Sequence, residues 1–240
     1  MLWLPGNSIM KKKLDHLEGK IALISRAAVF KGLSEHALKN FADLAVSVSY
    51  AKNDIVLHSH DPCFAFILVE RGLIRVSRYS ALGKRLTYLL AGPGEPINLV
   101  GPFTGASRAY VAEAVVDTTI LSVNRKDFLS FSFANHQLII NTIDILGHAV
   151  DSSNTRILDM LEKKVIQRLK RVLHTLSQKF GPELNFTAEE IAELASTTTE
   201  SSLRVLADLR SNGIIGKSRG QIHILKSEAL IDAETEDLWI

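Results

Sequence analysis

The 240-residue sequence predicts an α+β fold in three parts: an N-terminal sandwich or jelly roll of short strands, one long helix, and a C-terminal winged pair of short helices. Three observations predict it. Apolar and polar residues alternate in short runs from Val46 to Asn124, apolar residues recur at helical spacing from about His136, and two short helical segments near residue 200 precede two short β runs. We place the domain boundaries at 1–20 for an N-terminal arm, 21–135 for the β domain, 136–162 for the long helix, 163–232 for the winged helix pair and 233–240 for a tail.

The first part begins with helices. After an arm of doubtful order, a helical stretch is expected from about Ile21. In "VFKGLSEHALKNFADLA", Ser34 is expected to cap a helix whose apolar residues follow at helical spacing. From Val46 the period changes to two, and about eight short strands within about eighty residues indicate a sandwich, a jelly roll or a small barrel.

The long helix is expected after a shorter one over "NRKDFLSFSFAN". Its apolar residues step by four and three in alternation, which is typical of a coiled-coil seam about three heptads long. Pairing with a second copy of the chain would bury this seam, and packing against the chain's own β domain is the alternative. The seam consists of Ile139, Ile143, Leu146, Val150, Ile157 and Met160, with Ser153 as its one polar member.

The stretch "TAEEIAELASTTTESSLRVLADLRSNGII", residues 187–215, predicts two short helices with a tight break. Thr187 and Glu190 stand at capping-box positions of the first helix, which turns Ile191 and Leu194 inward. Ser196 and Thr197 break it. Thr198 or Thr199 caps the second helix, which is expected to bury Leu203, Leu206 and Leu209.

The other face of the second helix carries short polar side chains near its N-terminus, which suits a helix that reads base edges in the major groove. Arg204 suits O6 and N7 of guanine, and Glu200 suits N4 of cytosine. An ordinary surface ion pair between these two residues is the alternative. The segment from Lys163 to Leu225 holds ten Lys or Arg against six Asp or Glu, which favours an anionic partner. The expected DNA contacts are Thr198, Thr199, Glu200, Ser201 and Arg204, with Lys217 and Arg219 in the wing.

Composition excludes several classes of protein. The one cysteine, Cys63, excludes an intramolecular disulfide and any multi-cysteine zinc or iron–sulfur site. No apolar run approaches the roughly 20 residues of a membrane span, and the apolar N-terminal residues precede the basic ones, the reverse of a secretory signal. We therefore expect a cytoplasmic protein. No nucleophile elbow, phosphate-binding loop or zinc-protease motif occurs, so we do not expect an enzyme.

The order of these parts, with "IAELASTTTESSLRVLADLRSNGII" followed by "GKSRGQIHI", resembles the CRP/FNR family of bacterial transcription regulators over about Val29 to Leu230. "FILVERGLIRVSRYSALGKRLTYLLAGPGEP" resembles that family's cyclic-nucleotide-binding-like β-roll. The resemblance implies a homodimer whose long dimerisation helix carries a winged helix-turn-helix, with a small effector controlling its binding to a palindromic operator in double-stranded DNA.

The resemblance also implies roles for single residues. Glu200 and Arg204 match the family's base-reading glutamate and arginine. Thr199 stands where cyclic-AMP receptors have another arginine, and Leu203 where the oxygen-sensing branch has a serine. RNA polymerase would be a partner if the protein is an activator. A regulatory subunit that acts on another protein is a different class, and it would not need the winged part.

The resemblance places the effector pocket between the β-roll and the long helix. In "GEPINLVGPFTGASRAY", Arg108 matches the family's phosphate-binding arginine, in what we expect to be a helix-free turn. The family's glutamate turn is replaced from Asn98 to Gly101, and Ala149 and Val150 stand at its Thr-Ser positions, which disfavours cyclic AMP. The expected pocket comprises Asn98, Leu99, Val100, Arg108, Ala109, Tyr110, His148, Ala149 and Val150.

The cofactor stays open at this point. The iron–sulfur chemistry of the oxygen-sensing branch is excluded by the single cysteine. A more apolar pocket suits haem or another hydrophobic molecule, and haem would make the protein a sensor of nitric oxide or carbon monoxide. The candidate haem ligands are His58, His60, Cys63 and His148. The alternatives are exposed histidines in a hairpin turn, a hydrogen-bonded histidine on the helix, and a redox-active thiol at Cys63.

Overall fold

The structure is a computed structural model that describes residues 17–218, 221–231 and 238. The chain divides into two compact units. Unit 1 comprises Met1–Val76 and Leu90–Gly147, and unit 2 comprises Ser77–Leu89 and His148–Ile240. The expected α+β architecture, with an N-terminal β-roll and a C-terminal winged helix-turn-helix, is confirmed.

Unit 1 begins with helices. Residues 17–26 are helical, so the helix expected from about Ile21 already includes residues 17–20, which we had assigned to the arm. A 3₁₀ turn, Ala28–Phe30, leads to α2, Glu35–Leu44. Ser34 caps α2 as predicted, since its hydroxyl accepts a hydrogen bond from the Ala37 amide at 3.2 Å. Residues 1–16, most of the expected arm, lie outside the described residues.

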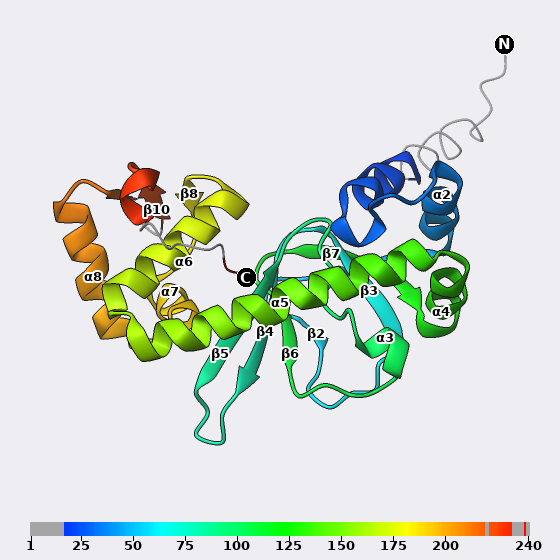
Figure 1. Cartoon of the computed structure of the whole chain (residues 1–240), viewed down its shortest axis with the longest axis horizontal. Coiled ribbons are helices and arrows are strands. Elements are labelled where there is room, and N and C mark those ends of the chain that lie inside the picture. The colour runs from blue at the N-terminus through cyan, green and yellow to red at the C-terminus, as the bar shows by residue number, and fades with distance from the viewer. Residues whose placement is uncertain (1–16, 219–220, 232–237, 239–240) are drawn as a thin grey trace, which may run out of the picture. The chain divides into compact units, whose positions relative to one another are not determined.

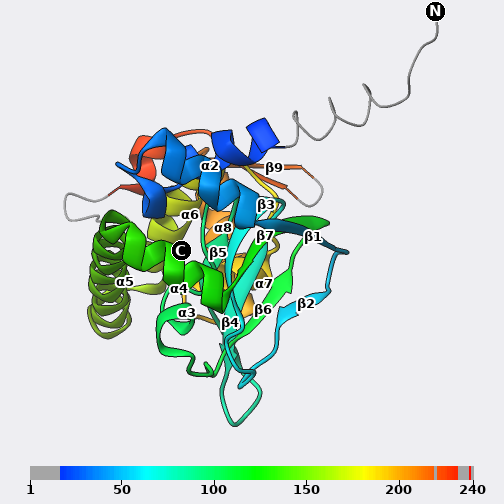
Figure 2. The same cartoon turned by 90° about the vertical axis from the view of Figure 1, so that its right-hand side faces the viewer.

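The β-roll consists of two sheets (Figures 1 and 2). One has the strand order β1-β7-β3, from Val46–Tyr50, Thr118–Asn124 and Ala65–Arg71. The other has the order β2-β6-β4-β5, from Ile55–Leu57, Val111–Ala114, Ile74–Tyr79 and Arg85–Ala91. The tip of the β4–β5 hairpin, residues 77–89, belongs to unit 2 although the base of the hairpin belongs to unit 1.

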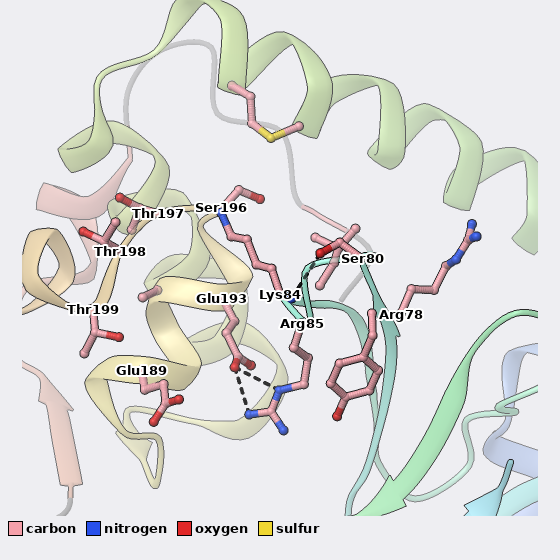
Figure 3. Close-up of a pocket in the computed structure, with 15 residues that line it drawn as sticks. Arg78, Ser80, Lys84, Arg85, Glu189, Glu193, Ser196, Thr197, Thr198 and Thr199 are labelled. Carbon is pink, nitrogen blue, oxygen red and sulfur yellow. Dashed lines mark hydrogen bonds and ion pairs between the residues drawn. The ribbon is translucent and has the colours of Figure 1, made fainter. Parts of the chain in front are cut away.

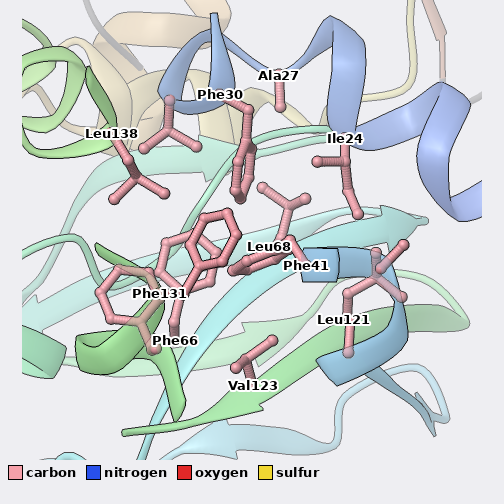
Figure 4. Close-up of a cluster of buried hydrophobic side chains, with 14 of the residues drawn as sticks. Ile24, Ala27, Phe30, Phe41, Phe66, Leu68, Leu121, Val123, Phe131 and Leu138 are labelled. Carbon is pink, nitrogen blue, oxygen red and sulfur yellow. The ribbon is translucent and has the colours of Figure 1, made fainter. Parts of the chain in front are cut away.

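Phenylalanine side chains from the helices and from the roll form the core of unit 1 (Figure 4). Phe66 of β3 stacks on Phe128 with ring centroids 4.5 Å apart, and Phe30 meets Phe41 at the same distance. Aromatic pairs in these arrangements add stabilisation beyond the area that they bury. The helices at either end of unit 1 are therefore held on the roll by one continuous core.

Three further helices follow the strands or lie between them. The turn expected to be helix-free contains the short helix α3, Gly101–Thr104, so that prediction was wrong. Pro102 stands near its start, where a missing amide hydrogen costs nothing, and Gly105 ends it in the left-handed region. Asn124 caps α4, Arg125–Ala134. The long helix α5 spans His136–Glu162. The side-chain amide of Asn141 on this helix donates hydrogen bonds to the backbone carbonyls of Val29 and Lys31.

Unit 2 contains the C-terminal elements. These are α6 (Val165–Phe180), β8 (Glu183–Leu184), α7 (Ala188–Leu194), α8 (Thr199–Ser211), β9 (Ile215–Ser218), β10 (Gln221–Ile224) and the 3₁₀ turn Ser227–Leu230. The strands pair antiparallel in the order β8-β10-β9. β9 and β10 form the hairpin expected as the wing, and β8 adds a third strand that was not predicted. None of the helices in the described ranges has the length and hydrophobicity that a bilayer crossing requires.

Candidate nucleic-acid interface

Helix α7 begins with a complete capping box. The Thr187 hydroxyl accepts a hydrogen bond from the Glu190 amide at 3.2 Å, and the Glu190 carboxylate accepts one from the Thr187 amide at 2.8 Å. Ile191 and Leu194 are buried as predicted. Local sequence therefore fixes both the start of α7 and the face that it turns inward.

The break between α7 and α8 lies at Ser196, whose φ of 52° is in the left-handed region that few residues other than glycine adopt. Of the two candidate caps for α8, Thr198 is the one used: its hydroxyl accepts from the Ser201 amide at 3.2 Å. Thr199 is the first residue of the helix and is exposed. The turn thus opens α8 with several small hydroxyl side chains at its N-terminus.

Glu200 and Arg204 stand one turn apart on the exposed face of α8. Within the described part of the chain, neither side chain makes a hydrogen bond or an ion pair. The surface ion pair considered as an alternative is therefore not formed in this structure. Both charged groups are available to an external ligand.

Leu203 lies on this exposed face, with 51% of its surface accessible, so the prediction that α8 buries it was wrong. The buried row of α8 consists of Ser202, Val205, Leu206 and Leu209. The spacing of the polar residues could have shown this, because Leu203 follows Glu200 by three and precedes Arg204 by one. Leu206 and Leu209 are buried as predicted.

The wing brings β9 and β10 together, with Lys217 opposite Ile222 in the register. The structure describes the backbone of Lys217 but not its side chain, and Arg219 lies outside the described residues. Ser201 is half-buried beside Thr198, with which it shares a hydroxyl hydrogen bond at 3.0 Å. The predicted helix contacts therefore gather at the N-terminal half of α8.

Buried charged groups tie α7 to the end of α5 within unit 2. The Arg156 guanidinium donates to the Leu194 carbonyl at 3.0 Å and to the Thr87 carbonyl at 3.1 Å. Burial lowers the pKa of Arg156 from its ordinary value. Asp159 and Arg171 form an ion pair at 2.9 Å, with 8% of each side chain exposed. This network joins α5, α6 and α7.

A cavity of about 830 Å³ lies between the tip of the β4–β5 hairpin, α7 and the turn before α8 (Figure 3). On one wall the Arg85 guanidinium faces Glu193. Although burial opposes the charge, the hydrogen bond and the charge of Glu193 keep the pKa of Arg85 above its ordinary value. The opposite wall includes Thr198 and Thr199. No sequence pattern singled out this pair, because its members are far apart in the chain.

The predicted seam on α5 is partly exposed. Ile143, Val150, Ile157 and Met160 are exposed by 46–64%, whereas Ile139 and Leu146 are half-buried and Leu146 packs on the core of unit 1. Ser153 is exposed and hydrogen-bonds to the Ala149 carbonyl. Ile140 and Leu161, which the prediction omitted, are exposed by 58% and 77%. The exposed row therefore contains Ile143, Val150 and Ile157, which alternate along the helix with Ile140, Gly147, Asn154 and Leu161.

The predicted effector residues of the β-roll gather around α3. The Asn98 amide group donates to the Cys63 sulfur at 3.1 Å, and its oxygen accepts from the Gly101 amide at 2.9 Å. The other roll residues of the set are Leu99, Val100, Ala109, Arg108 and Tyr110; of these Leu99 is buried and the rest are half-buried. His148, Ala149 and Val150 belong to unit 2.

Electrostatics distinguish the groups in this cluster. Burial raises the pKa of the Cys63 thiol. The pKa of Tyr110 is also raised, mainly by burial and to a smaller extent by the charge of Cys63. The positive charge of Arg108 lowers both pKa values but does not outweigh these causes. No hydrogen bond or ion pair to the Arg108 guanidinium occurs among the described residues.

The four candidate haem ligands belong to both units. In unit 1, His58 and His60 are exposed on the segment between β2 and β3 and Cys63 is buried, and in unit 2 His148 is exposed on α5. In the described ranges, no group of three or more His, Cys, Asp or Glu residues could hold a metal ion.

Comparisons with known proteins match both halves of the chain. Residues 47–135 match the cyclic nucleotide-binding domain, and residues 167–233 match the Crp-like helix-turn-helix domain. The chain is 27% identical over 208 residues to the cyclic AMP receptor protein of Thermus thermophilus, covering 84% of this chain and 94% of that protein. It is 21% identical over 216 residues to the CRP-like cAMP-activated global transcriptional regulator of Mycobacterium tuberculosis, covering 87% and 96%. Among solved structures, FixK2 from Bradyrhizobium japonicum superposes with a TM-score of 0.70 at 20% identity, covering 78% of this chain and 95% of that one.

Proposed function

Because the chain joins a cyclic nucleotide-binding domain to a Crp-like helix-turn-helix domain, it belongs to the CRP/FNR family of transcription regulators, and on that premise we propose that it is a homodimer that binds a palindromic DNA operator under the control of a small effector. The observation that carries the proposal is the unpaired state of Glu200 and Arg204 on the exposed face of α8. A regulator of this kind acts on chromosomal DNA, so the proposal includes a cytoplasmic location.

The exposed face of α8 supports direct reading of base pairs. An arginine fork matches O6 and N7 of guanine, and a carboxylate accepts a hydrogen bond from N4 of cytosine. Since the two charged groups are exposed one turn apart, they can address neighbouring base pairs of one half-site. The backbone amides at the N-terminus of α8, with Lys217 and Arg219 of the wing, would contact phosphates.

The exposed row on α5 supports the dimer. Ile143, Val150 and Ile157 recur every seven residues and are each more than half exposed. A row of this kind is stabilised when a second helix covers it, and the heptad spacing favours a parallel pair. Two copies related by a dyad would present two α8 helices to half-sites about 34 Å apart.

The β-roll supports an effector other than cyclic AMP. Both polar ends of the Asn98 side chain are already used, by Cys63 and by Gly101. The Arg108 guanidinium is half-buried and without a partner among the described residues, so it suits an anionic group on the effector. We therefore propose a small anionic molecule as the effector, with haem as the alternative cofactor.

The test is selection of bound duplexes from a random library, followed by competition binding of the selected site. We expect an inverted repeat for the wild-type protein. Arg204→Ala should remove about 1 to 3 kcal/mol of discrimination at one base pair in each half-site. Arg210→Ala is the matched control, since it removes the same exposed side chain from the last turn of α8. An unchanged site preference for Arg204→Ala would overturn the role of Arg204, and the absence of any enriched sequence would overturn the proposed function.

A further inference from the structure

A second cavity, of about 410 Å³, lies within the winged helix-turn-helix domain. Its walls come from α8, from the start of α7 and from both strands of the wing. Four of the apolar side chains that line it are exposed by 6% or less: Phe186, Leu206, Ile215 and Ile222. The cavity therefore reaches the hydrophobic core of this domain, and a molecule inside it would meet side chains that are shielded from water.

Leu203 and Ala207 extend this apolar lining to the surface. They lie four residues apart on α8, and both are exposed, Leu203 by 51%. An exposed leucine forgoes the free energy that burial of its side chain would provide. A molecule that fills the cavity would cover the part of Leu203 that lines it, and would supply an apolar contact that the described residues do not provide.

Arg210 carries the only charge among the described side chains that line the cavity. Its guanidinium makes no hydrogen bond or ion pair within the described part of the chain. The polar side chains beside it are already engaged. The Thr187 hydroxyl exchanges hydrogen bonds with Glu190, and the Gln221 amide donates to Asn185 at 2.8 Å. The cavity thus combines apolar walls with one cationic group that is available to a ligand.

We propose that this cavity binds a small aromatic carboxylic acid, and that it is a ligand site in addition to the effector site proposed for the β-roll. Small-molecule sites have volumes of about 300 to 1,000 Å³ and are lined mainly by apolar side chains, with a few polar groups that orient the ligand. A planar aromatic ring suits these walls, because it buries a large area and packs well beside Phe186. A carboxylate suits Arg210, whose guanidinium can donate two parallel hydrogen bonds to it.

The experiment measures binding of 2-naphthoate to the full-length protein by calorimetry, without DNA, so the site is tested independently of the proposed function. We expect a Kd on the order of 0.1 mM, which is usual for a ligand of this size. The neutral analogue 2-naphthamide should bind about tenfold more weakly, because it lacks the charge that Arg210 would contact. Arg210→Ala should weaken 2-naphthoate about tenfold and change 2-naphthamide by less than about twofold. Ala207→Phe, which adds a ring to the lining, should weaken 2-naphthoate by at least about tenfold.

Ser211→Phe is the matched control, because it adds the same ring at an exposed position of α8 that does not line the cavity. It should keep the wild-type affinity, and thermal unfolding checks that all variants fold. Hydrogen exchange should slow in residues 203–210 when 2-naphthoate is bound. The proposal would be overturned by a wild-type protein that does not bind 2-naphthoate, by equal affinities for the wild-type protein and Ala207→Phe, or by protection confined to the β-roll. An equal loss of both analogues in Arg210→Ala would overturn the preference for a carboxylate.

Discussion

The Arg85 guanidinium contacts one oxygen of Glu193 through two nitrogens: Nε donates a hydrogen bond at 2.9 Å, and a terminal nitrogen forms an ion pair with the same oxygen at 2.9 Å. The second carboxylate oxygen accepts from the Thr87 hydroxyl at 3.3 Å. The pair joins the β4–β5 hairpin to α7, the helix that precedes α8, which we propose to read bases. Since the side chains are only 22% and 15% exposed, solvent screens this charge pair less than an ordinary surface pair.

Replacing Glu193 by alanine should loosen the hairpin tip. The change removes the carboxylate that accepts from the partly buried Arg85 guanidinium, and we expect a loss of about 1 to 3 kcal/mol in the unfolding free energy. Hydrogen exchange measured by mass spectrometry should accelerate in residues 77–89. Glu189→Ala is the control, because Glu189 lines the same cavity and is exposed. Equal exchange in both variants would show that the pair does not hold the hairpin.

The Asp159–Arg171 pair should matter more to stability. Asp159→Ala leaves the Arg171 guanidinium buried without this carboxylate, and removal of one partner of a buried pair costs about 3 to 5 kcal/mol. Urea unfolding measures the change. Asp151→Ala, at an exposed position of the same helix, should alter stability by no more than about 0.5 kcal/mol. A loss below about 1 kcal/mol for Asp159→Ala would contradict a structural role for the pair.

Aspartate at the exposed row of α5 should separate the proposed dimer. Val150 and Ile157 are 59% and 51% exposed, so carboxylates there leave the monomer fold intact but would be buried in a helix pair. Val150→Asp combined with Ile157→Asp should therefore sediment as a monomer of 26.5 kDa where the wild-type protein sediments at about twice that mass. Leu82→Asp serves as control at a position that is 96% exposed on the hairpin. A double variant that still sediments as a dimer would place the interface elsewhere.

The protein should not bind haem in stoichiometric amount. Burial disfavours the Cys63 thiolate that would be the ligand, Asn98 already contacts its sulfur, and His58 and His60 are exposed. An absorption spectrum of the reduced, haem-supplemented protein, taken before and after addition of carbon monoxide, checks this. A stoichiometric band that shifts with the gas would reverse the choice of effector and make each of the four candidate ligands a target for substitution.

Local chemistry accounts for what the sequence predicted well. Ser34, Thr187 and Thr198 act through groups within three residues, so a short stretch of sequence is enough to locate the helix starts that they cap. The spacing of apolar residues along the sequence likewise identified the strands of the β-roll and the two short helices of the winged helix-turn-helix.

Long-range packing accounts for what was missed. Arg85 and Glu193 are 108 residues apart, and no periodicity relates them. Leu203 was misjudged for a different reason: its apolar character was weighed above the polar residues that share its face of α8.

Unit 2 is not one continuous stretch of chain, since it includes residues 77–89 from the middle of the β-roll. Recombination between two related genes at the long helix would therefore separate Arg85 from Glu193, giving a hybrid in which one parent's hairpin meets the other parent's α7. Positions 85 and 193 must be inherited together, or change together, for such hybrids to keep the pair. Substitutions at these two positions should accordingly be correlated among natural descendants of this chain.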